Sequence, residues 1–416
     1  MRVDTLELLR CPYCGGRLSL VESLHHRRTA DEIHDGILGC HCCIFPVVDG
    51  IPVLHLQASA AAAREHVEAG RPDLARRAMF GIADAAEAEA FDAVAASDTS
   101  TYREIVEALG PNFEGGYFLY RFSDPTYIVA QALARAVGST VLGGARRAID
   151  LCGGSGHVTR TLLDLSSAPP VLADLYFSKI WLARRFTAPG CEPICCDGNS
   201  PFPFARGAFS FAMCTDAFMF IWTKRQFVTE MERLIANDDP HPGAVLIGHT
   251  HNERVWSPSH GNPLSPEAYA DLFETLEPSV FAEAGLFADV VKGGPLDLSR
   301  RDAKDALDAD PAIALVASRN PRVFGRHPLP VSDRATGEFR LNPLYAAQAD
   351  GSNVRLTLRF PSEDYEQEYG ACRESLPTEE IMDRTALDAL PAARVSGALA
   401  GLARRRIVLD LPRRYY

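Results

Sequence analysis

The fold of this chain is decided by the stretch Ile149-Asp150-Leu151-Cys152-Gly153-Gly154-Ser155-Gly156-His157. An apolar run predicts a buried strand, and a series of small residues then leads into a helix. Gly154 and Gly156 let the backbone come close to a ligand, and the N-terminus of the following helix offers N–H donors and the positive end of its dipole. The stretch therefore predicts the first strand-to-helix turn of a doubly wound α/β sheet, with a nucleotide-type cofactor beside it.

Two acidic residues follow this turn at suitable distances. Asp174 lies at the end of the next apolar run, where its carboxylate can accept hydrogen bonds from both hydroxyls of a ribose. Asp197 closes the third apolar run and can accept a hydrogen bond from an adenine amino group. Both residues could instead be ordinary loop acids, but their shared register with the glycine turn favours a cofactor site.

Further apolar runs complete the predicted sheet. Helical segments separate them, as expected for a parallel sheet covered on both faces. One predicted helix spans Lys224–Ile235, and Ser265 is a good N-cap for another that begins at Pro266. The predicted strands are Ala148–Leu151, Val171–Leu175, Glu192–Cys196, Phe209–Cys214 and Gly243–His249, followed by Phe287–Lys292 and Ala312–Val316.

The succession of motifs over residues 140–319 resembles that of class I S-adenosylmethionine-dependent methyltransferases. Their pattern runs hDhGxGxG, hDhS, xDhxxLPFxxxxFD and EhxRhLxPGG, and the last element stands here as Glu230-Met231-Glu232-Arg233-Leu234-Ile235 before Pro242-Gly243. The resemblance implies a Rossmann-like, doubly wound sheet of seven strands that binds S-adenosylmethionine. It also implies the following roles: Asp150 orients the glycine turn, Gly154 and Gly156 face the methionine moiety, Asp174 faces the ribose and Asp197 the adenine.

Two positions depart from this family pattern. Cys152 stands in place of the first glycine, and Ser210 stands in place of the usual Asp after Phe209. Cys152 is small enough to leave the turn intact if its φ angle is negative. We therefore expect an altered cofactor pocket in which this thiol is packed and not catalytic.

Two pairs of cysteines near the N-terminus predict a metal site. The first is Cys11-Pro12-Tyr13-Cys14 and the second is Cys40-His41-Cys42-Cys43, and a turn at Asp49-Gly50 between two short strands follows them. Tetrahedral zinc with four thiolates fits this arrangement. Because so short a segment buries little core, the metal would supply much of its folding energy. Four core cysteines without metal are the alternative.

Residues 1–56 resemble the small zinc ribbon of the tRNA-methyltransferase activator family. That ribbon combines a CPxC knuckle, a second CxxC knuckle and a closing hPVxDGIPxL strand pair. We expect zinc to be held by Cys11, Cys14, Cys40 and Cys43, with Cys42 a structural thiol. Four thiolates leave no open coordination position, so the ribbon is expected to stabilise the fold or to dock a substrate or protein partner.

Candidate catalytic residues follow the fifth predicted strand. His249 and His251 leave the carboxyl edge of the sheet and, at a spacing of two, would share one face of a strand. One of them could act as the base that takes a proton from the methyl acceptor. The alternatives are a second metal site with His260, or a role only in structure or in hydrogen bonding to the substrate.

Aromatic residues flank the predicted site on two sides. Tyr120 and Arg121, with Tyr117 and Tyr127, predict a lid over the cofactor in which Arg121 meets a carboxylate, and plain core packing is the alternative. The residues after the fourth predicted strand either shape an apolar acceptor pocket or pack a helix. These are Phe218, Phe220 and Trp222.

With 416 residues, the chain is long enough for several cores. We expect a zinc ribbon over 1–56, a helical linker and cap over 57–139, a methyltransferase domain over 140–319 and an α+β accessory domain over 320–416. In the last region, the sequence predicts strands over Val354–Phe360 and Arg406–Leu411 and a helical stretch over Pro377–Leu390.

Composition narrows the set of partners. The net charge of −12 disfavours extensive contact with a phosphate backbone, and residues 1–56 carry five Arg against seven Asp and Glu. A membrane span and a secretion signal are both absent from the sequence pattern, which predicts a cytoplasmic protein.

The sequence therefore predicts an S-adenosylmethionine-dependent methyltransferase that acts on a small-molecule, glycan or peptide acceptor. A ribosomal RNA methyltransferase is the runner-up, because a ribbon fused to such a core is reminiscent of bacterial ribosomal-RNA guanine methyltransferases. The third hypothesis is a noncatalytic scaffold that binds the cofactor and docks a partner through the ribbon.

Overall fold

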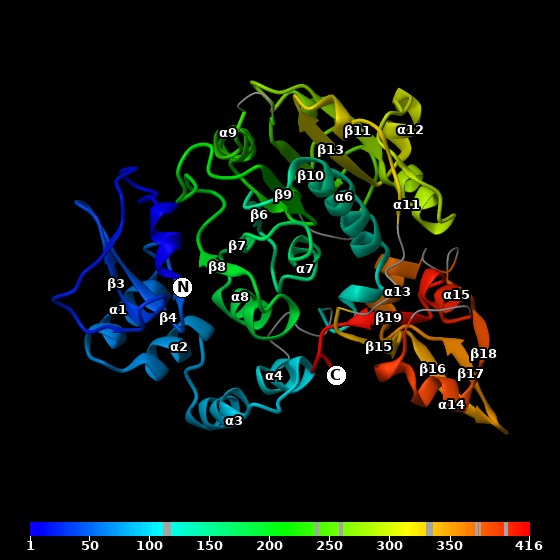
Figure 1. The fold of residues 1–416 in the computed structure, drawn as a ribbon, viewed down its shortest axis with the longest axis horizontal. Helices are drawn as coiled ribbons and strands as arrows, with labels where there is room; N and C mark the ends of the chain where they lie inside the picture. Colours follow the sequence, from blue (N-terminus) through cyan, green and yellow to red (C-terminus); the bar gives the residue numbers. More distant parts are fainter. Residues whose placement is uncertain are drawn as a thin grey trace.

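The computed structural model describes residues 1–110, 118–237, 241–257, 261–329, 336–370, 373, 376–394 and 398–416. Tyr117 and His260 lie outside these ranges. A seven-stranded sheet forms the centre of the molecule, with residues 1–56 to one side and the C-terminal region to the other (Figure 1). Its strands are β6 (Ala148–Leu151), β7 (Val171–Asp174), β8 (Glu192–Cys195), β9 (Phe211–Thr215), β10 (Ala244–His251), β11 (Pro278–Ala282) and β13 (Ala312–Ser318).

The strands of this central sheet lie in the order β11-β13-β10-β9-β6-β7-β8. The pairs from β10 to β8 are parallel, while β13 runs antiparallel to both β10 and β11. The chain first builds outward from β6 through β7 to β8 and then continues on the other side of β6 with β9. This reversal makes the carboxyl ends of β6 and β9 a topological switch point, which is where ligands bind in open α/β sheets.

Helices cover both faces of the central sheet. On one face, Leu133 and Val137 of α6 (Pro125–Val141) belong to the same apolar cluster as Phe211, Met213 and Leu246 of the sheet. On the other face, α9 (Lys224–Leu234) shares a cluster with the alternate strand residues Ala212, Val245 and Ile247. Strands buried on both faces have continuous apolar runs in the sequence, and this is why six of the seven predicted strands agree with the observed ones to within two residues at each end. The other helices of this region are α7 (Thr159–Leu162), α8 (Phe177–Leu182, continued by a π-helical turn Ala183–Thr187), α10 (Pro266–Ala270), α11 (Glu283–Val291) and α12 (Lys304–Ala309).

The predicted sixth strand, Phe287–Lys292, is wrong. Phe287–Val291 belongs to α11, and the sixth strand is β11, which precedes this helix. Leu286, Phe287 and Val290 face the core at helical spacing. Their short apolar run looks like a strand, but its period is that of a helix.

Residues 1–56 form a small sheet that is joined to the central one. Its strands pair in the order β1-β3-β4-β5, with β2 beside β3, and Asp49 and Gly50 both adopt positive φ in the turn between β4 and β5. The N–H of Leu54 donates to the carbonyl of Cys195 at 2.7 Å, and Arg10 N–H donates to Pro203 O at 2.9 Å. The small sheet therefore continues the central sheet beyond its edge strand β8. Its strands are β1 (Ser19–Leu20), β2 (Arg27–Arg28), β3 (Ile33–Gly39), β4 (Ile44–Val48) and β5 (Ile51–Pro52).

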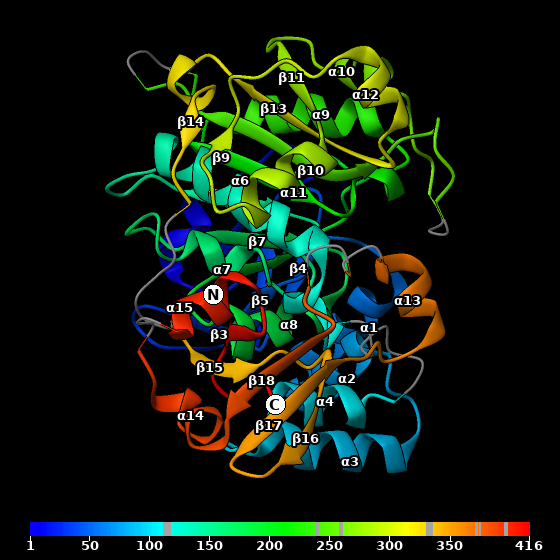
Figure 2. The same cartoon turned by 90° about the vertical axis from the view of Figure 1, so that its right-hand side faces the viewer.

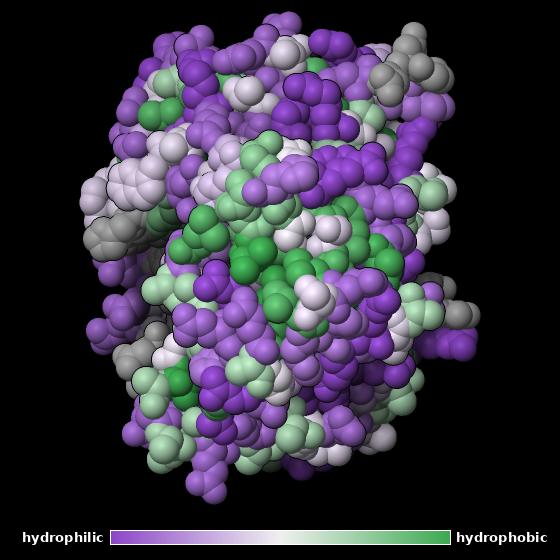
Figure 3. All heavy atoms as spheres, turned by 90° about the vertical axis from the view of Figure 1, so that its left-hand side faces the viewer, coloured by the Kyte–Doolittle hydropathy of each residue, from purple (hydrophilic) through white to green (hydrophobic). Residues whose placement is uncertain are grey.

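The segment from residue 57 to 110 is helical, as the sequence predicts. It comprises α1 (Ala58–Glu68), α2 (Pro72–Phe80), α3 (Ala85–Ala96) and α4 (Tyr102–Ala108). Helix α6 follows and runs across the expected domain boundary between residues 139 and 140. On the side of the molecule that carries residues 1–56, a band of apolar surface crosses a face that is otherwise mostly hydrophilic (Figure 3).

The C-terminal region holds two further sheets. The pair β15-β19 lies beside the three-stranded sheet β16-β17-β18 (Figure 2). The helix predicted over Pro377–Leu390 is largely wrong, because β18 occupies Glu379–Asp383, where only Met382 of the strand is buried, and a helix is confined to Arg384–Asp388. The elements are β15 (Glu338–Leu341), β16 (Tyr345–Asp350), β17 (Asn353–Leu358), β18, β19 (Val408–Leu411), α13 (Glu363–Tyr369), α14 (Arg384–Asp388) and α15 (Ala398–Arg404), with the small pair β12 (Leu296–Asp297) and β14 (Arg326–His327) before them.

The end of the chain ties this region to the core. Tyr415 Oη donates to Phe118 O at 2.6 Å and lies 2.7 Å from His157 Nε2, in the turn that leads from β6 to α7. Arg160 donates to Asp410 O at 2.7 Å. No helix within the described ranges is both long enough and apolar enough to cross a membrane.

Candidate functional site

The turn after β6 is shaped by Asp174. The N–H of Gly154 donates to Asp174 Oδ2 at 2.9 Å, and the N–H of Tyr176 donates to Asp174 Oδ1 at the same distance. A carboxylate oxygen can accept more than one hydrogen bond. Asp174 therefore links the first two loops at the carboxyl edge of the sheet.

The two glycines of the turn are needed for different reasons. Gly154 and Gly156 have φ angles of 54° and 74°, in the left-handed region that favours glycine. A Cβ at Gly156 would lie only 2.8 Å from the Cβ of Ala183, so close packing of the turn on the neighbouring helix excludes any side chain there. A Cβ at Gly154 would meet nothing closer than Phe118, at 3.8 Å. Gly154 is the position that leaves backbone accessible to a ligand.

Cys152 does not have the negative φ under which we expected it to leave the turn intact. Its φ angle is 58°, which for a residue with a Cβ costs about 1 kcal/mol or more. Its N–H donates to Ala173 O at 2.7 Å, and its thiol lies 3.3 Å from the place that a Cβ on Gly198 would take. Cys152 thus adopts a left-handed backbone conformation that favours glycine, and its side chain makes this conformation strained.

Asp150 lies beneath the turn and does not line it. The side chain is fully buried, Thr159 Oγ1 donates to Oδ2 at 2.6 Å, and a Cβ on Gly153 would lie 2.6 Å from its Cγ. Burial raises the pKa of this carboxyl to about 7, against the lowering effect of the Thr159 hydrogen bond. Asp150 therefore supports the turn through buried contacts with Gly153 and Thr159.

Asp197 stands at the carboxyl end of β8, next to Asp174. It accepts a hydrogen bond from the N–H of Asn199 at 2.9 Å, while the side chain of Asn199 accepts one from Trp222 N–H at 2.8 Å. The N–H of Cys196 donates to Asp174 O at 3.0 Å. The carboxyl ends of β6, β7 and β8 and the loops after them thus carry five of the residues that the sequence assigned to the cofactor, which are Cys152, Gly154, Gly156, Asp174 and Asp197.

A chain of charged groups occupies the other half of the same edge. Arg121 is buried and donates to Asp124 Oδ2 at 2.8 Å, and its second terminal nitrogen lies 3.0 Å from Asp216 Oδ2. The other oxygen of Asp216 is 3.9 Å from His249 Nε2. His249 in turn directs both its ring Nδ1 and its backbone N–H at Glu283, at 2.7 and 2.6 Å. Arg121, Asp216, His249 and Glu283 each lie in or directly after a different element of the chain.

The topology explains why Glu283 reaches this place. β11 runs antiparallel to β13, which runs antiparallel to β10, so β11 and β10 end at the same edge. Glu283 directly follows β11, and Asp216 directly follows β9. Sequence reasoning missed both residues. The position of Asp216 directly after the fourth strand could have identified it as a candidate site residue. No neighbouring sequence feature identifies Glu283 as a partner of His249.

The residues of this edge are conformationally strained. Asp216 and His249 have φ angles of 57° and 46°, and β10 has a register shift between Ile247 and Thr250 that re-aims His249. With Cys152, they are three of the six non-glycine residues with positive φ among those described, and they follow or end three neighbouring parallel strands. Strained residues of this kind cluster at functional sites, where the surrounding structure holds them.

The pKa values of the two predicted catalytic histidines, His249 and His251, are shifted in opposite directions. Burial alone would lower the pKa of His249, but the Glu283 carboxylate outweighs it and raises that pKa to about 9. Burial, together with the neighbouring His249, lowers the pKa of His251 to about 4. Their rings are 5.4 Å apart. At neutral pH His249 is a cation that cannot accept a proton, and His251 is neutral but a weak base.

Only some of the residues of the predicted lid lie at this site. Arg121 lies in it, but Tyr120 packs its ring against Tyr365 of α13 at 5.7 Å, and Tyr127 Oη accepts a hydrogen bond from Gln131 at 2.8 Å. In the loop after β9, Phe218 is buried against Phe227 of α9, while Trp222 is 77% exposed. Tyr117 falls outside the described residues.

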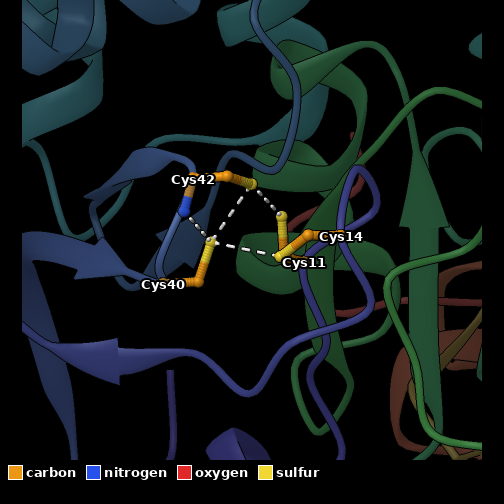
Figure 4. Close-up of side chains that lie close together, drawn as sticks. All are labelled: Cys11, Cys14, Cys40 and Cys42. Carbon is orange, nitrogen blue, oxygen red and sulfur yellow. Dashed lines mark hydrogen bonds between the residues drawn. The ribbon is translucent and has the colours of Figure 1, made fainter.

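The N-terminal cysteines form a compact cluster, with Cys11 and Cys14 on one loop facing Cys40 and Cys42 on another (Figure 4). Their four sulfurs all lie within 4.8 Å of one another, with separations of 3.6 Å for Cys11–Cys42 and Cys40–Cys42 and 3.7 Å for Cys14–Cys40. A tetrahedron with Zn–S bonds of about 2.3 Å has sulfurs about 3.8 Å apart, so the donor set fits zinc.

Cys43, the predicted fourth ligand, is outside this group of four. Its sulfur lies 3.3 Å from that of Cys42, and its N–H donates to Cys40 Sγ at 3.3 Å. The structure thus brings together three of the four predicted thiols and places Cys42 with them. The role of Cys43 as a metal ligand stays a prediction.

Comparison with known proteins gives only remote similarity. No protein-family model matches the chain, and no curated protein matches it. A putative methyltransferase from Bacillus halodurans is 16% identical with a TM-score of 0.30, over 47% of this chain and 99% of that one. A complex of the Haloferax volcanii Trm112 methyltransferase activator with a putative methyltransferase gives 17% identity and a TM-score of 0.34, over 45% and 88%. Geranyl diphosphate C-methyltransferase from Streptomyces coelicolor gives 14% and 0.33, over 45% and 75%. With TM-scores in this range, the chain's own residues have to carry any functional conclusion.

Proposed function

We propose that this protein is an S-adenosylmethionine-dependent methyltransferase. The observation that carries the proposal is the Asp174 carboxylate, which receives the N–H of Gly154 at the switch point of the sheet. The residues that would hold the cofactor are Gly154 on the methionine side, where the buried Gly156 packs the turn on the neighbouring helix, Asp174 on the ribose and Asp197 on the adenine. When bound, the cofactor would supply an electrophilic methyl group on a sulfonium.

The acceptor side of the site is proposed to centre on Asp216. Its carboxylate is held between the Arg121 guanidinium and the protonated His249 ring, at the end of the strand next to β6. With the cofactor bound, a carboxylate in this place would take the proton from the O–H or N–H of an attacking group. The attacking atom's new bond to the methyl carbon would replace that carbon's bond to the sulfonium sulfur, which would leave as a thioether. Arg121, His249 and Glu283 act as positioning residues, because they hold Asp216 in a strained conformation.

We propose a small-molecule, glycan or peptide acceptor. The charged groups at the site are three carboxylates (Asp124, Asp216 and Glu283) and two cations, which together disfavour an acceptor as anionic as RNA. The exposed Trp222 beside the site offers an apolar surface to such a molecule. The cytoplasmic location predicted from the sequence goes with this proposal.

The ribbon is proposed to hold one structural zinc ion. Its sheet extends the central sheet at β8, so loss of the metal would also loosen the edge that carries Asp197. Metal analysis of the native protein should find about one zinc per chain. Cys42→Ser and Cys43→Ser are matched variants that identify the fourth ligand, because only the ligand's variant should lose zinc readily to a chelator. Native protein without zinc would remove the metal from the account.

Calorimetric titration tests the cofactor assignment. S-adenosylmethionine and S-adenosylhomocysteine should both bind to the native protein, and Asp174→Ala should weaken both by about tenfold or more. Asp388→Asn, an exposed change on α14, is the control and should bind like the native protein. If neither ligand binds to the native protein, or if Asp174→Ala binds them as tightly as the native protein does, the proposed cofactor site is wrong.

An acceptor screen then separates the classes of function. Release of S-adenosylhomocysteine in the presence of small molecules, glycans or peptides is the expected result. Steep salt-dependent binding and methylation of ribosomal RNA would favour the runner-up instead. Intact cofactor binding without turnover on any acceptor class would favour the scaffold.

A further inference from the structure

The small sheet of residues 1–56 contacts helix α8 through its Asp49-Gly50 turn. The indole N–H of Trp181 donates to Asp49 Oδ2 at 3.0 Å, and the Arg184 guanidinium donates to Asp49 O at 3.1 Å. A Cβ on Gly50 would collide with the Arg184 guanidinium, so the turn packs closely on the helix. Asp49 thus binds both α8 and the π-helical turn that continues it.

The same helix also supports the proposed cofactor turn. Thr187, in the π-helical turn, donates its hydroxyl to Ser155 O. A Cβ on Gly156 would lie 2.8 Å from Ala183 Cβ, which belongs to the same π-helical turn. The N-terminus of the helix follows Asp174 closely in the chain. The helix therefore joins the turn after β6 to the loop after β7, and a shift of the helix would move both.

The Asp49 carboxylate is itself held in place. It is partly buried, and Arg76 of α2 lies 3.3 Å from Oδ2, the oxygen that accepts the indole N–H. The backbone N–H of Asp49 donates to the buried Asp35 at 3.1 Å. Trp181 is only 7% exposed, so loss of the carboxylate would leave a buried N–H without its acceptor. The carboxylate thus fixes the position of this helix relative to residues 1–56.

We propose that Asp49 is a positioning residue for the cofactor site. It holds the helix at Trp181 and Arg184, and the helix holds the turn at Ser155 and Gly156. Cofactor binding and the contact between Asp49 and Trp181 should therefore stabilise each other by the same factor. Only the effect on the cofactor rests on the proposed function, because the contact itself does not depend on what the site binds.

Calorimetric titration of S-adenosylhomocysteine into the full-length protein tests this role. Asp49→Gly deletes the carboxylate and keeps the turn, because glycine accepts the positive φ of this position. It should weaken binding by about fivefold. The matched control is Asp92→Ala, which should bind within about twofold of the native protein. Asp92 of α3 also pairs with Arg76, at 3.6 Å, but within the described residues it forms no hydrogen bond or ion pair with α8.

A double-variant cycle separates positioning from a general loss of stability. Trp181→Phe removes the indole N–H and leaves the sequence of the Asp49 turn unchanged. It should also weaken binding, and it serves as the test if Asp49→Gly does not fold. Because both changes act on one contact, the double variant should bind no more weakly than the weaker of the two single variants. Two independent kinds of structural damage would instead give losses that add.

The indole N–H of Trp181 gives a measurement on the native protein. The chain has three tryptophans, and the signal of Trp181 is the indole signal that disappears from NMR spectra of Trp181→Phe. S-adenosylhomocysteine should slow the exchange of this hydrogen with solvent by about fivefold, because the coupling is reciprocal. In Asp49→Gly this slowing should be lost.

The possible results separate this role from the proposed function. Equal binding by Asp49→Gly and the native protein, an equal loss in Asp92→Ala, additive losses in the cycle, or an exchange rate that the ligand does not change would each overturn the role of Asp49. The cofactor site would stand in all four cases. Native protein that does not bind S-adenosylhomocysteine would remove the proposed function, and the positioning role with it.

Discussion

The two halves of the sheet's carboxyl edge are held together in different ways. In the half formed by the loops after β6, β7 and β8, most contacts are made by backbone N–H groups and small residues, as in the hydrogen bond from Gly154 N–H to Asp174. In the half formed by β9, β10 and β11, the contacts are between charged side chains, from Arg121 through Asp216 and His249 to Glu283. The first half should therefore depend less on charged side chains, although the buried Asp150 beneath its turn, with a pKa raised to about 7, titrates near neutrality. The second half should respond strongly to charge and to pH.

Removing the Glu283 charge should have the largest effect on stability. Glu283→Gln keeps the shape of the side chain but leaves the buried His249 ring without its counter-ion. The pKa of His249 should fall, and the free energy of unfolding at neutral pH should drop by about 2–4 kcal/mol, as for a broken buried pair. Glu277→Gln, an exposed change just before β11, is the matched control for chemical denaturation. A loss within about 0.5 kcal/mol of the control would mean that charge does not hold this half together.

The pH dependence of stability should separate the two histidines. The pKa of His249 is about 9 in the folded protein against 6.5 for a free histidine, so its contribution is complete below pH 6.5 and is lost as the pH rises through 9. The difference between native protein and Glu283→Gln, on the order of 2 kcal/mol or more at neutral pH, should shrink above pH 9. His251, with its pKa lowered to about 4, costs stability in the opposite range, as the pH falls below 6.5. Denaturation of both proteins at several pH values measures this, and a difference that stays constant to pH 10 would contradict it.

The smallest effect should come from the turn after β6. Cys152→Gly relieves a positive φ, whereas Cys152→Ala keeps the strain and only removes the sulfur. The Gly variant should be more stable than the Ala variant by about 1 kcal/mol, because only the backbone preference separates them at this φ. Chemical denaturation of the two variants gives the comparison directly. Equal stabilities would mean that the turn is not strained.

The two halves of the edge also differ in how well the sequence predicts them. The half formed by the loops after β6, β7 and β8 is encoded locally, by apolar runs and by Gly154, Gly156 and Asp174 in one stretch of chain. The φ of Cys152 could not be predicted, since the hydrogen bonds of the turn impose it and side-chain size does not. Phe287–Lys292 failed because a short apolar run does not reveal its period.

In the charged half, only single members were visible. His249 was recognisable as a polar residue at the end of a strand, but its protonation depends on Glu283, which arrives from a distant strand through an antiparallel connection. The predicted role of His249 as a base assumed an ordinary pKa. Likewise, Cys42 and Cys43 are adjacent in the sequence, and only the arrangement of the loops places Cys42 with Cys11, Cys14 and Cys40.

The most direct test of this division is calorimetric titration of S-adenosylhomocysteine into two matched variants, Asp174→Asn and Asp216→Asn. Each replaces a carboxylate by an amide of the same shape, and Asn tolerates the positive φ of Asp216. Asp174→Asn should weaken binding by about tenfold or more, while Asp216→Asn should stay within about threefold of the native protein. Equal loss in both variants, or loss in Asp216→Asn alone, would contradict the separation of the edge into a cofactor half and an acceptor half.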